Sequence, residues 1–387
     1  MSRPINRETL PITERVASTV RRHAAQSGLI TKLLRALSGR STPPFLINRA
    51  AANGLVREEF EASLKAVKQW DHLPLVFSGI ASELNERALY WDELGLNSRT
   101  SAYYLQSSLW DFYAQLLCVS DHESKALFYA RCAQSYRHAA AYFEYPAASV
   151  EIPHRSGALR GYLRLPATDA QRKHPCVILI NTVNSTKEEL HYTENAFVKM
   201  GIATLSFDLP GFGESLVNRQ DLCDMEILSN TLFLFIAQQR EINPEKLALH
   251  GLGVGGALAI NLALLSPQRY KAVATLSAPY NLKTTLSHLL PAVRREAVTL
   301  THGAEEILYD LAHHLASADD LSDLRCPLLV AGGGRDILAS AADTKRIYDL
   351  AGSPDKKLLY IPKAGHGCCE VMPSLRFEIA QWIRQRI

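Results

Sequence analysis

The sequence has little charge excess and no long apolar run, and both absences exclude whole classes of protein. Its 387 residues carry a formal net charge of only +3, without the concentrated basic face that is typical of nucleic-acid binding. No uninterrupted apolar stretch approaches the roughly 20 residues that cross a bilayer. The polar N-terminus also lacks the apolar region of a signal peptide. We therefore expect a soluble protein with neither a nucleic-acid nor a membrane partner.

Cysteine is scarce and irregularly placed. The seven cysteines form no C-x-x-C pair, which argues against a zinc ribbon or a thioredoxin-type site. His313 and His314 have no acidic or thiol partner at ligand spacing. Free thiols indicate a reducing, cytoplasmic setting, and we predict neither a metal nor a cofactor.

Glycine and strand-like runs are rare in the first part of the chain, which shows helical spacing up to residue 148. From residue 149 onward, after the expected hairpin "SVEIPH"/"ALRGYLRLP", strand-like runs such as "CVILIN" and "IATLSFDLP" alternate with helical ones. This alternation requires right-handed crossovers and a mostly parallel sheet. We expect an all-helical domain over residues 1–148 and an α/β domain over residues 149–387, with a mainly helical insertion at about 280–323.

The stretch "KLALHGLGVGGALAI", residues 246–260, joins a strand-like run to a helical run through a glycine-rich turn. Gly251, Gly253 and Gly256 fit the G-x-G-x-x-G of a dinucleotide site. However, the turn follows the fifth expected strand, and no acidic residue ends the next one. Gly251 and Gly255 fit the G-x-S-x-G of a nucleophile elbow. We favour an elbow in which Gly253 stands where the serine should be.

An elbow of this kind predicts an acid and then a histidine, each just past a later strand. Asp336 follows the run "CPLLVAGG", and His366 follows "KLLYIPKAG". We predict that His366 is a general acid–base and that Asp336 orients it. Cys368 and Cys369 follow closely, but buried structural thiols are commoner than nucleophiles.

Two further stretches carry a family resemblance. "NTVNSTKEEL", residues 181–190, resembles the oxyanion-side loop of FrsA-like esterases, which typically reads Gly-Gly-Leu-(Asp/Glu)-Ser-x-Lys-Glu. "DLPGFGES", residues 208–215, resembles the loop that these proteins carry after the following strand. The chain departs from the family at Asn181-Thr182, where the family has Gly-Gly, and at Gly253. The resemblance implies an α/β-hydrolase core behind an N-terminal helical lid domain, and it allows a homodimer through the lid.

The predicted elbow also suggests where a developing oxyanion would bind. The backbone N–H of Val254 should point into the pocket, and the loop near Thr182 and Val183 should supply a second donor. His250, directly before the turn, is expected to pack against it or brace it.

Some side chains have two interpretations. Tyr104, Trp110 and Tyr113 could line a lid-side substrate pocket, although aromatic residues at helical spacing are more often core. Ser185 is predicted to cap a helix with Glu188 as its capping-box partner. Lys187 and Glu188 are expected to form a solvated or loop-bracing pair.

Glycine at position 253 excludes an acyl-enzyme on that residue. A base with an oxyanion hole suits proton abstraction next to a carbonyl, followed by cyclisation, elimination or C–C cleavage by activated water. The group that the chain resembles includes C–C hydrolases and enzymes of retro-Claisen cleavage. We therefore predict a small-molecule carbonyl substrate, polyketide-like or acyl. Two alternatives stay open: a non-catalytic ligand-binding protein, and a Ser-to-Gly variant of a serine esterase or C–C hydrolase.

Overall fold

The computed structural model describes residues 44–67, 70–118, 121–166, 173–215, 217–288, 305–315 and 318–387. The described chain divides into two compact units. Among the described residues, the helical unit contains residues 44–47 and Leu55–Tyr142, and the sheet unit contains Asn48–Gly54 and those from Phe143 to Ile387. The sequence places the boundary after residue 148, whereas the structure places it after Tyr142 and adds a short N-terminal segment to the sheet unit. Residues 289–304 of the expected insertion lie outside the described residues.

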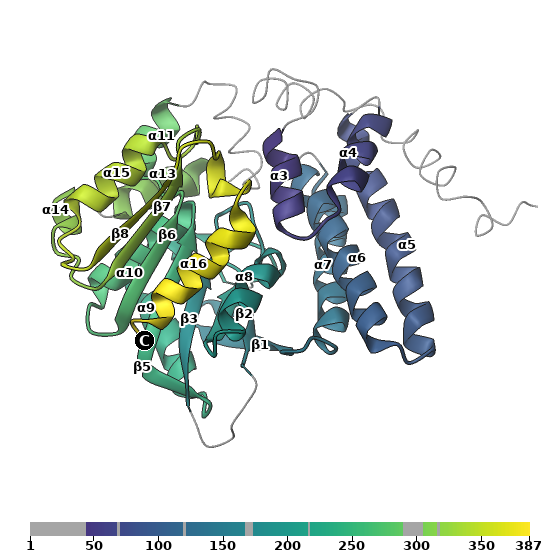
Figure 1. Cartoon of the computed structure of the whole chain (residues 1–387), viewed down its shortest axis with the longest axis horizontal. Helices are drawn as coiled ribbons and strands as arrows, with labels where there is room; N and C mark the ends of the chain where they lie inside the picture. The colour runs from purple at the N-terminus through teal and green to yellow at the C-terminus, as the bar shows by residue number, and fades with distance from the viewer. Residues whose placement is uncertain are drawn as a thin grey trace, which may run out of the picture. The chain divides into compact units, whose positions relative to one another are not determined.

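The helical unit is built from long helices, as its spacing predicts (Figure 1). Its elements are α4 (Arg57–Ala66), η3 (Trp70–His72), α5 (Leu73–Glu93), α6 (Asn97–Leu117) and α7 (His122–Ala140), and α3 (Pro44–Ala52) runs from this unit into the next. Local signals set some boundaries: Pro74 lies in the first turn of α5, and Asp121 caps α7 by accepting the Ser124 N–H at 3.0 Å.

The sheet unit contains eight strands. They are β1 (Ala147–His154), β2 (Gly157–Arg164), β3 (His174–Ile180), β4 (Ala203–Phe207), β5 (Ile242–Leu252), β6 (Tyr270–Leu276), β7 (Leu328–Gly333) and β8 (Lys356–Ile361). Their order is β1-β2-β4-β3-β5-β6-β7-β8. β1 and β2 form the expected antiparallel hairpin, β2 is antiparallel to β4, and all other neighbours are parallel. The predicted α/β class with a mostly parallel sheet is confirmed.

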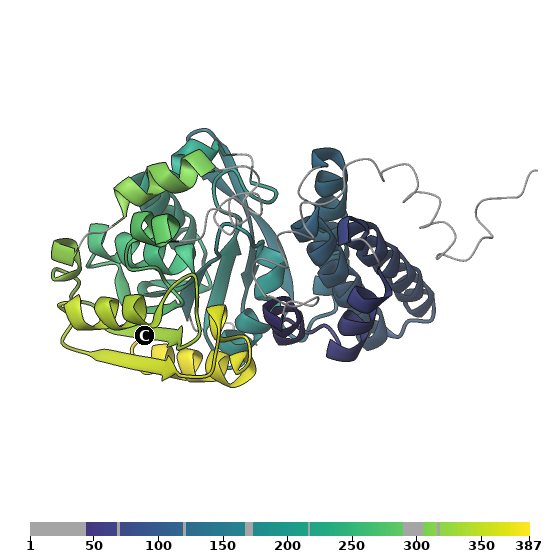
Figure 2. The same cartoon turned by 90° about the horizontal axis from the view of Figure 1, so that it is seen from above.

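Helices cover both faces of this sheet (Figures 1 and 2). They are η4 (Lys187–Leu190), α8 (His191–Val198), η5 (Arg219–Cys223), α9 (Met225–Ala237), α10 (Val254–Leu265), α11 (Leu282–His288), α13 (Glu305–His314), α14 (Ala318–Leu321), α15 (Ala341–Leu350), η6 (His366–Cys368) and α16 (Met372–Arg384). Alternation along β3 shows the two faces: Ile178 and Ile180 pack in the core under α9 and α10, and Val177 and Leu179 pack in the core under α8 and α16.

The strand order reverses direction between β3 and β5, which lie side by side in the sheet. In open α/β sheets, ligands bind at such a switch point, beyond the carboxyl ends of the strands. The loop after β3 and the turn after β5 both begin at this edge, because Ile180 is paired with Gly251. The fold therefore brings the two predicted halves of the site together.

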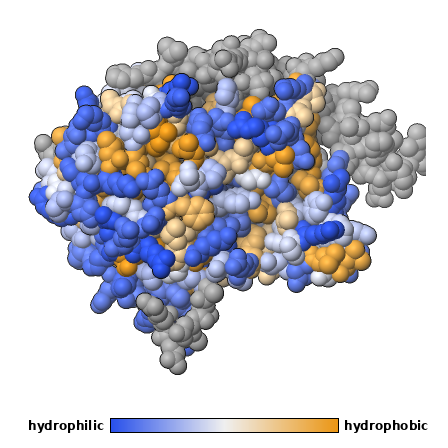
Figure 3. Space-filling view, viewed as in Figure 1, coloured by the Kyte–Doolittle hydropathy of each residue, from blue (hydrophilic) through white to orange (hydrophobic). Residues whose placement is uncertain are grey.

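None of the described helices is long and apolar enough to cross a membrane. Apolar colour gathers at the turn between α5 and α6 (Figure 3, lower right), where Leu89, Leu94 and Leu96 are exposed. The homodimer stays a prediction.

Candidate active site

The turn between β5 and α10 has the sharp backbone that an elbow requires. β5 ends at Leu252, α10 begins at Val254, and Gly253 between them has φ 57° and ψ −125°. L-residues rarely adopt a positive φ, so the position is strained for any side chain. The Gly253 N–H donates to the Leu276 carbonyl at 2.8 Å, which ties the turn to β6. Gly255 gives the room for this packing, because a Cβ there would overlap the carbonyl oxygens of Ile180 and Asn181.

Asp336 and His366 are hydrogen-bonded to each other. The His366 Nδ1–H faces the Asp336 carboxylate, at 2.9 Å from Oδ2 and 3.1 Å from Oδ1. The backbone N–H groups of Leu338 and Ala339 each donate to Oδ1 at 2.9 Å. Burial acts to raise the pKa of Asp336, but the charge and hydrogen bond of His366 and these two donors outweigh it, so the pKa is lowered. The carboxylate is therefore a fixed anion that orients the imidazole.

The second imidazole nitrogen of His366 faces the glycine turn. A Cβ built on Gly253 would lie 3.7 Å from Nε2. A side-chain hydroxyl at position 253 would therefore lie near this nitrogen, which is the relation of nucleophile and histidine in a serine hydrolase. In this chain the histidine faces the turn, but the turn carries no hydroxyl.

The loop that holds His366 is fixed by a residue that the sequence did not suggest. Ser277, just after β6, accepts the Gly367 N–H on its Oγ at 2.9 Å, and it has a positive φ of 51°. The thiol of Cys369 donates to the His366 carbonyl at 3.7 Å. Burial raises the pKa of Cys368 and Cys369 to about 12. Both are therefore neutral thiols, which supports the structural interpretation over a thiolate nucleophile.

The oxyanion donors stay a prediction, and the residues named for them lie on the two segments that follow β3 and β5. Val254 opens α10, and the first N–H groups of a helix have no intrahelical acceptor. Thr182 and Val183 follow β3 directly, and within the part of the chain that the structure describes their N–H groups make no hydrogen bond. The Thr182 side chain is also close: its Oγ1 and Cβ lie 3.0 and 3.2 Å from the Cβ built on Gly253.

Helix α3 anchors the loop that carries Thr182, and nothing in the sequence indicated this. Arg49 donates to Glu189 at 2.6 and 2.7 Å and to the Asn184 carbonyl at 3.2 Å. Ser185 also donates to Glu189. The expected capping box between Ser185 and Glu188 is therefore wrong, because Glu188 has other partners and Thr186 occupies the N-cap position.

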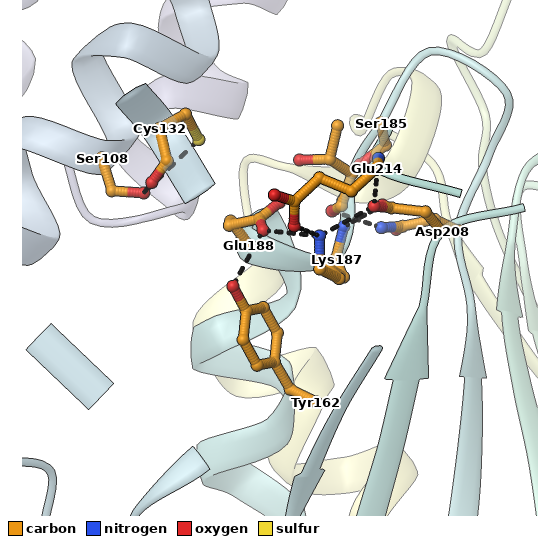
Figure 4. Close-up of polar contacts among 10 residues, drawn as sticks. Ser108, Cys132, Tyr162, Ser185, Lys187, Glu188, Asp208 and Glu214 are labelled. Atoms are coloured by element: carbon orange, nitrogen blue, oxygen red, sulfur yellow. Dashed lines mark hydrogen bonds and ion pairs between the residues drawn. The ribbon is translucent and has the colours of Figure 1, made fainter. Parts of the chain in front are cut away.

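Lys187 and Glu188 lie in a buried cluster of charges and are not solvated. Figure 4 shows Lys187 pointing toward three carboxylates, those of Asp208 at 2.8 Å, Glu188 at 2.9 Å and Glu214 at 2.9 Å. Tyr162 on β2 donates to Glu188 at 3.1 Å. Burial opposes the charge of Lys187, but the three carboxylates outweigh it and raise its pKa. Burial raises the pKa of Glu188.

This cluster braces the loop that follows β3. The Lys187 N–H donates to Asp208 at 3.0 Å, and the Glu214 N–H donates to the same carboxylate at 2.9 Å. Asp208 follows β4, so it connects η4 after β3 with the turn after β4. The loop-bracing alternative for Lys187 and Glu188 is thus supported, and the solvated one is wrong.

His250 is part of the packing and not of the site. It is buried, and its Nδ1–H donates to the Ala274 carbonyl at 3.1 Å. Burial lowers its pKa to about 4, so the ring is neutral at neutral pH. It connects β5 to β6 just before the turn.

The three aromatic residues proposed for a pocket lie inside the helical unit. The rings of Trp110 and Tyr113 pack against Phe60 at centroid distances of 5.5 and 5.1 Å. Tyr104 stacks on His138 at 5.0 Å. All three are buried. These contacts favour the core role over a pocket lining.

Together, the sheet and the arrangement of turn, acid and histidine define an α/β-hydrolase fold. Solved structures agree. The crystal structure of a 2,6-dihydroxy-pseudo-oxynicotine hydrolase superposes with a TM-score of 0.75 at 22% identity, covering 88% of this chain and 95% of that chain. AbyA5 superposes with a TM-score of 0.62 at 18% identity, covering 79% and 87%. At these identities the likeness shows the fold alone.

Sequence comparison finds similar proteins among named esterases and hydrolases. Residues 119–293 match the family model described as esterase FrsA-like. The chain is 26% identical to 2,6-dihydropseudooxynicotine hydrolase of Paenarthrobacter nicotinovorans over 312 residues, which cover 79% of this chain and 82% of that protein. It is 28% identical to esterase FrsA of Yersinia pestis over 146 residues, only 34% of that protein. The resemblance to FrsA-like esterases and pseudooxynicotine hydrolase is confirmed, and the chain is an α/β-hydrolase-fold relative of hydrolases.

Proposed function

We propose that this protein is an enzyme that uses His366 as general base and acid, without a covalent intermediate on the elbow. Asp336 orients the imidazole, and the N–H groups of Val254, Thr182 and Val183 stabilise negative charge on a carbonyl oxygen. The observation that carries the proposal is the position of His366 Nε2, 3.7 Å from where a Cβ on Gly253 would lie. The base faces the reaction position of the fold, and glycine leaves that position without a nucleophile.

The proposed substrate is a small carbonyl compound, polyketide-like or acyl. Removing a proton next to a carbonyl produces an enolate, which an oxyanion hole stabilises. Cyclisation, elimination or C–C cleavage by activated water can follow. A positioned general base contributes about 10²–10⁴ in rate. The relatives named as hydrolases support the cleavage reaction among these three.

The product mass distinguishes the three reactions. Purified protein is incubated with a panel of β-polyketones and acyl esters, and the products are identified by mass spectrometry. Products that together contain one added water indicate hydrolytic cleavage, an unchanged mass indicates cyclisation, and loss of water indicates dehydrating ring closure or elimination.

The matched variants are His366→Ala and His314→Ala, the second being an exposed histidine on α13. We expect His366→Ala to lose about 10²-fold or more of the turnover and His314→Ala to retain it. Retained turnover in His366→Ala would overturn the proposal. Thermal stabilisation by a compound of the panel without any turnover would instead identify a binding protein.

A further inference from the structure

Part of α3 and the two residues after it belong to the sheet unit. Asn48–Gly54 fall in this unit, although the chain directly before and after them falls in the helical unit. Ala52 packs in the core under α8 and α16, and a Cβ on Gly54 would overlap the ring of Tyr192 on α8. The segment Asn48–Gly54 is therefore packed closely into the sheet unit.

Arg49 in this segment holds the loop after β3 through Glu189. Its guanidinium donates one hydrogen bond to each oxygen of the Glu189 carboxylate, at 2.6 and 2.7 Å, and another to the Asn184 carbonyl at 3.2 Å. The Asn53 amide donates to the same carboxylate at 2.6 Å, and the Ser185 hydroxyl also donates to it. The side chains of Arg49 and Glu189 are only 16% and 6% exposed, so water competes little for these charged hydrogen bonds.

The hydrogen bonds continue from Glu189 to the residues predicted as oxyanion donors. Ser185, whose hydroxyl donates to Glu189, donates its backbone N–H to the Thr182 carbonyl at 3.1 Å. This carbonyl and the Val183 N–H belong to the same peptide group. Because a peptide group is planar, a contact that holds the carbonyl also fixes the direction of the N–H. Arg49 therefore acts on the predicted donor of Val183 through two intermediate side chains.

The same segment is also fixed to the loop that holds His366. Asn48 donates to the carboxylate of Glu370 at 3.3 Å, and this carboxylate accepts the N–H of Gly365, directly before the histidine, at 3.2 Å. Arg376 on α16, the helix that follows this loop, is buried and donates to the carbonyl of the last residue of α3 at 2.6 Å. Arg49 is thus held in place relative to the base.

We propose that Arg49 is a positioning residue for the reaction. Through Glu189 it fixes the peptide group between Thr182 and Val183 relative to His366, without contact with the reacting atoms. The proposal deepens the proposed function and rests on it, since this peptide group affects turnover only where negative charge develops on a substrate carbonyl oxygen. One oxyanion donor contributes about 10²–10³ in kcat, and a displaced donor loses part of that contribution.

The variants that test the proposal are Arg49→Ala and the matched control Arg386→Ala. Arg386 also donates to both oxygens of one carboxylate, that of Asp355, at 2.8 and 2.9 Å, and its side chain is 20% exposed. Asp355 precedes β8, whereas His366 follows it, so the control lies at the opposite end of this strand. Both variants lose a guanidinium that binds a carboxylate, but only one of them loses a contact with the loop after β3.

The first measurement is hydrogen exchange followed by mass spectrometry, which needs no substrate. We expect peptides that cover residues 181–190 to exchange about tenfold faster or more in Arg49→Ala than in the wild type, because the loop opens locally more often. The same peptides should exchange at the wild-type rate in Arg386→Ala. Unchanged exchange in Arg49→Ala would overturn the proposal, since the loop would then be held without this residue.

The second measurement separates positioning from stability, with a compound that the wild type consumes. We expect kcat of Arg49→Ala to fall by about 10- to 10²-fold with KM within about twofold, because the lost interaction acts in the transition state. Guanidinium chloride, far below denaturing concentrations, should restore part of kcat, and sodium chloride at the same ionic strength should not. Arg386→Ala should keep its kcat.

An unchanged kcat in Arg49→Ala, or an equal loss in Arg386→Ala, would overturn the positioning role while His366 stays the base. Retained turnover in His366→Ala would instead overturn the proposed function, so the two failures are distinguishable.

Discussion

Replacing Lys187 by methionine should destabilise the sheet unit strongly, because this lysine neutralises a buried group of carboxylates. Its ammonium lies 2.8 Å from Asp208, 2.9 Å from Glu188 and 2.9 Å from Glu214, and 1% of its side chain is exposed. Two of the three carboxylate side chains, those of Asp208 and Glu188, are 0% exposed. Methionine keeps most of the stem of the lysine but leaves these charges without their cation.

The expected magnitude follows from burial and not from distance. Removing one partner of a buried ion pair costs about 3–5 kcal/mol, since the remaining charge stays desolvated. Lys345→Met is the matched control: Lys345 lies 2.6 Å from Asp349, but the two side chains are 69% and 49% exposed. Exposed pairs of this i,i+4 type contribute only about 0.3–0.5 kcal/mol. The shorter distance belongs to the control, so the comparison isolates the effect of burial.

Thermal unfolding followed by circular dichroism compares the two variants. For a domain of about the size of the sheet unit, a loss of 1 kcal/mol in unfolding free energy lowers Tm by about 2–4 °C. We therefore expect Tm to fall by roughly 6–20 °C in Lys187→Met and by less than about 2 °C in Lys345→Met. Burial raises the pKa of Glu188, and Lys187 is a cause that lowers it. In Lys187→Met the pKa of Glu188 in the folded state therefore lies further above its pKa in the unfolded state. Stability is then lost as the pH rises through the folded-state pKa. The deficit should shrink in acid. Equal, small shifts for both variants at neutral pH would refute the reasoning.

Three further predictions concern His250, Trp110 and His366. The pKa of His250 is lowered to about 4 from 6.5, so stability present above pH 6.5 is lost as pH falls toward 4. His250→Asn keeps a donor for the Ala274 carbonyl but does not titrate. Between pH 6.5 and 4 its free energy of unfolding in urea should therefore fall by about 3 kcal/mol less than that of the wild type, and an unchanged pH profile would contradict the prediction. Trp110→Ala should cost about 3–5 kcal/mol and Trp110→Phe clearly less, measured by Tm, because Trp110 is core; no loss in the alanine variant would point back to a pocket lining. His366→Asn should keep a donor to Asp336 and most of the stability but lose turnover about 10²-fold or more, and unaltered turnover would argue against the base.

The sequence predicted the parts of the fold that depend on local pattern. Strand-like runs in alternation with helical runs predicted the parallel sheet, and the run ending near His250 became β5, which extends to Leu252. Asp336 and His366 were found because each follows a strand, and carboxyl ends of parallel strands meet at one edge of a sheet. The position of Gly253 in the elbow could be predicted because the G-x-S-x-G motif has a fixed spacing along the chain.

Contacts between distant segments could not be predicted in this way. Lys187 looks like a surface residue by type, and only the approach of Asp208 and Glu214 from another loop makes its burial favourable. Arg49 and its partner Glu189 are separated by 140 residues, and no local signal connects them. The same holds for Thr182, whose side-chain position depends on the pairing of β3 with β5. The resemblance of the motif to a known family identified the residues of the loop after β3, but it did not indicate which distant residues they contact.

The Asp336–His366 pair has a structural role, and its geometry also supports the role of His366 as a base that we propose. A buried carboxylate needs hydrogen-bond partners, and the Nδ1–H of His366, with the N–H groups of Leu338 and Ala339, supplies them. That structural need uses only one of the two imidazole nitrogens. The other, Nε2, faces Gly253, and the His366 side chain is 30% exposed. The orientation of Nε2 toward the turn is the geometry that the proposed role of His366 as a base requires.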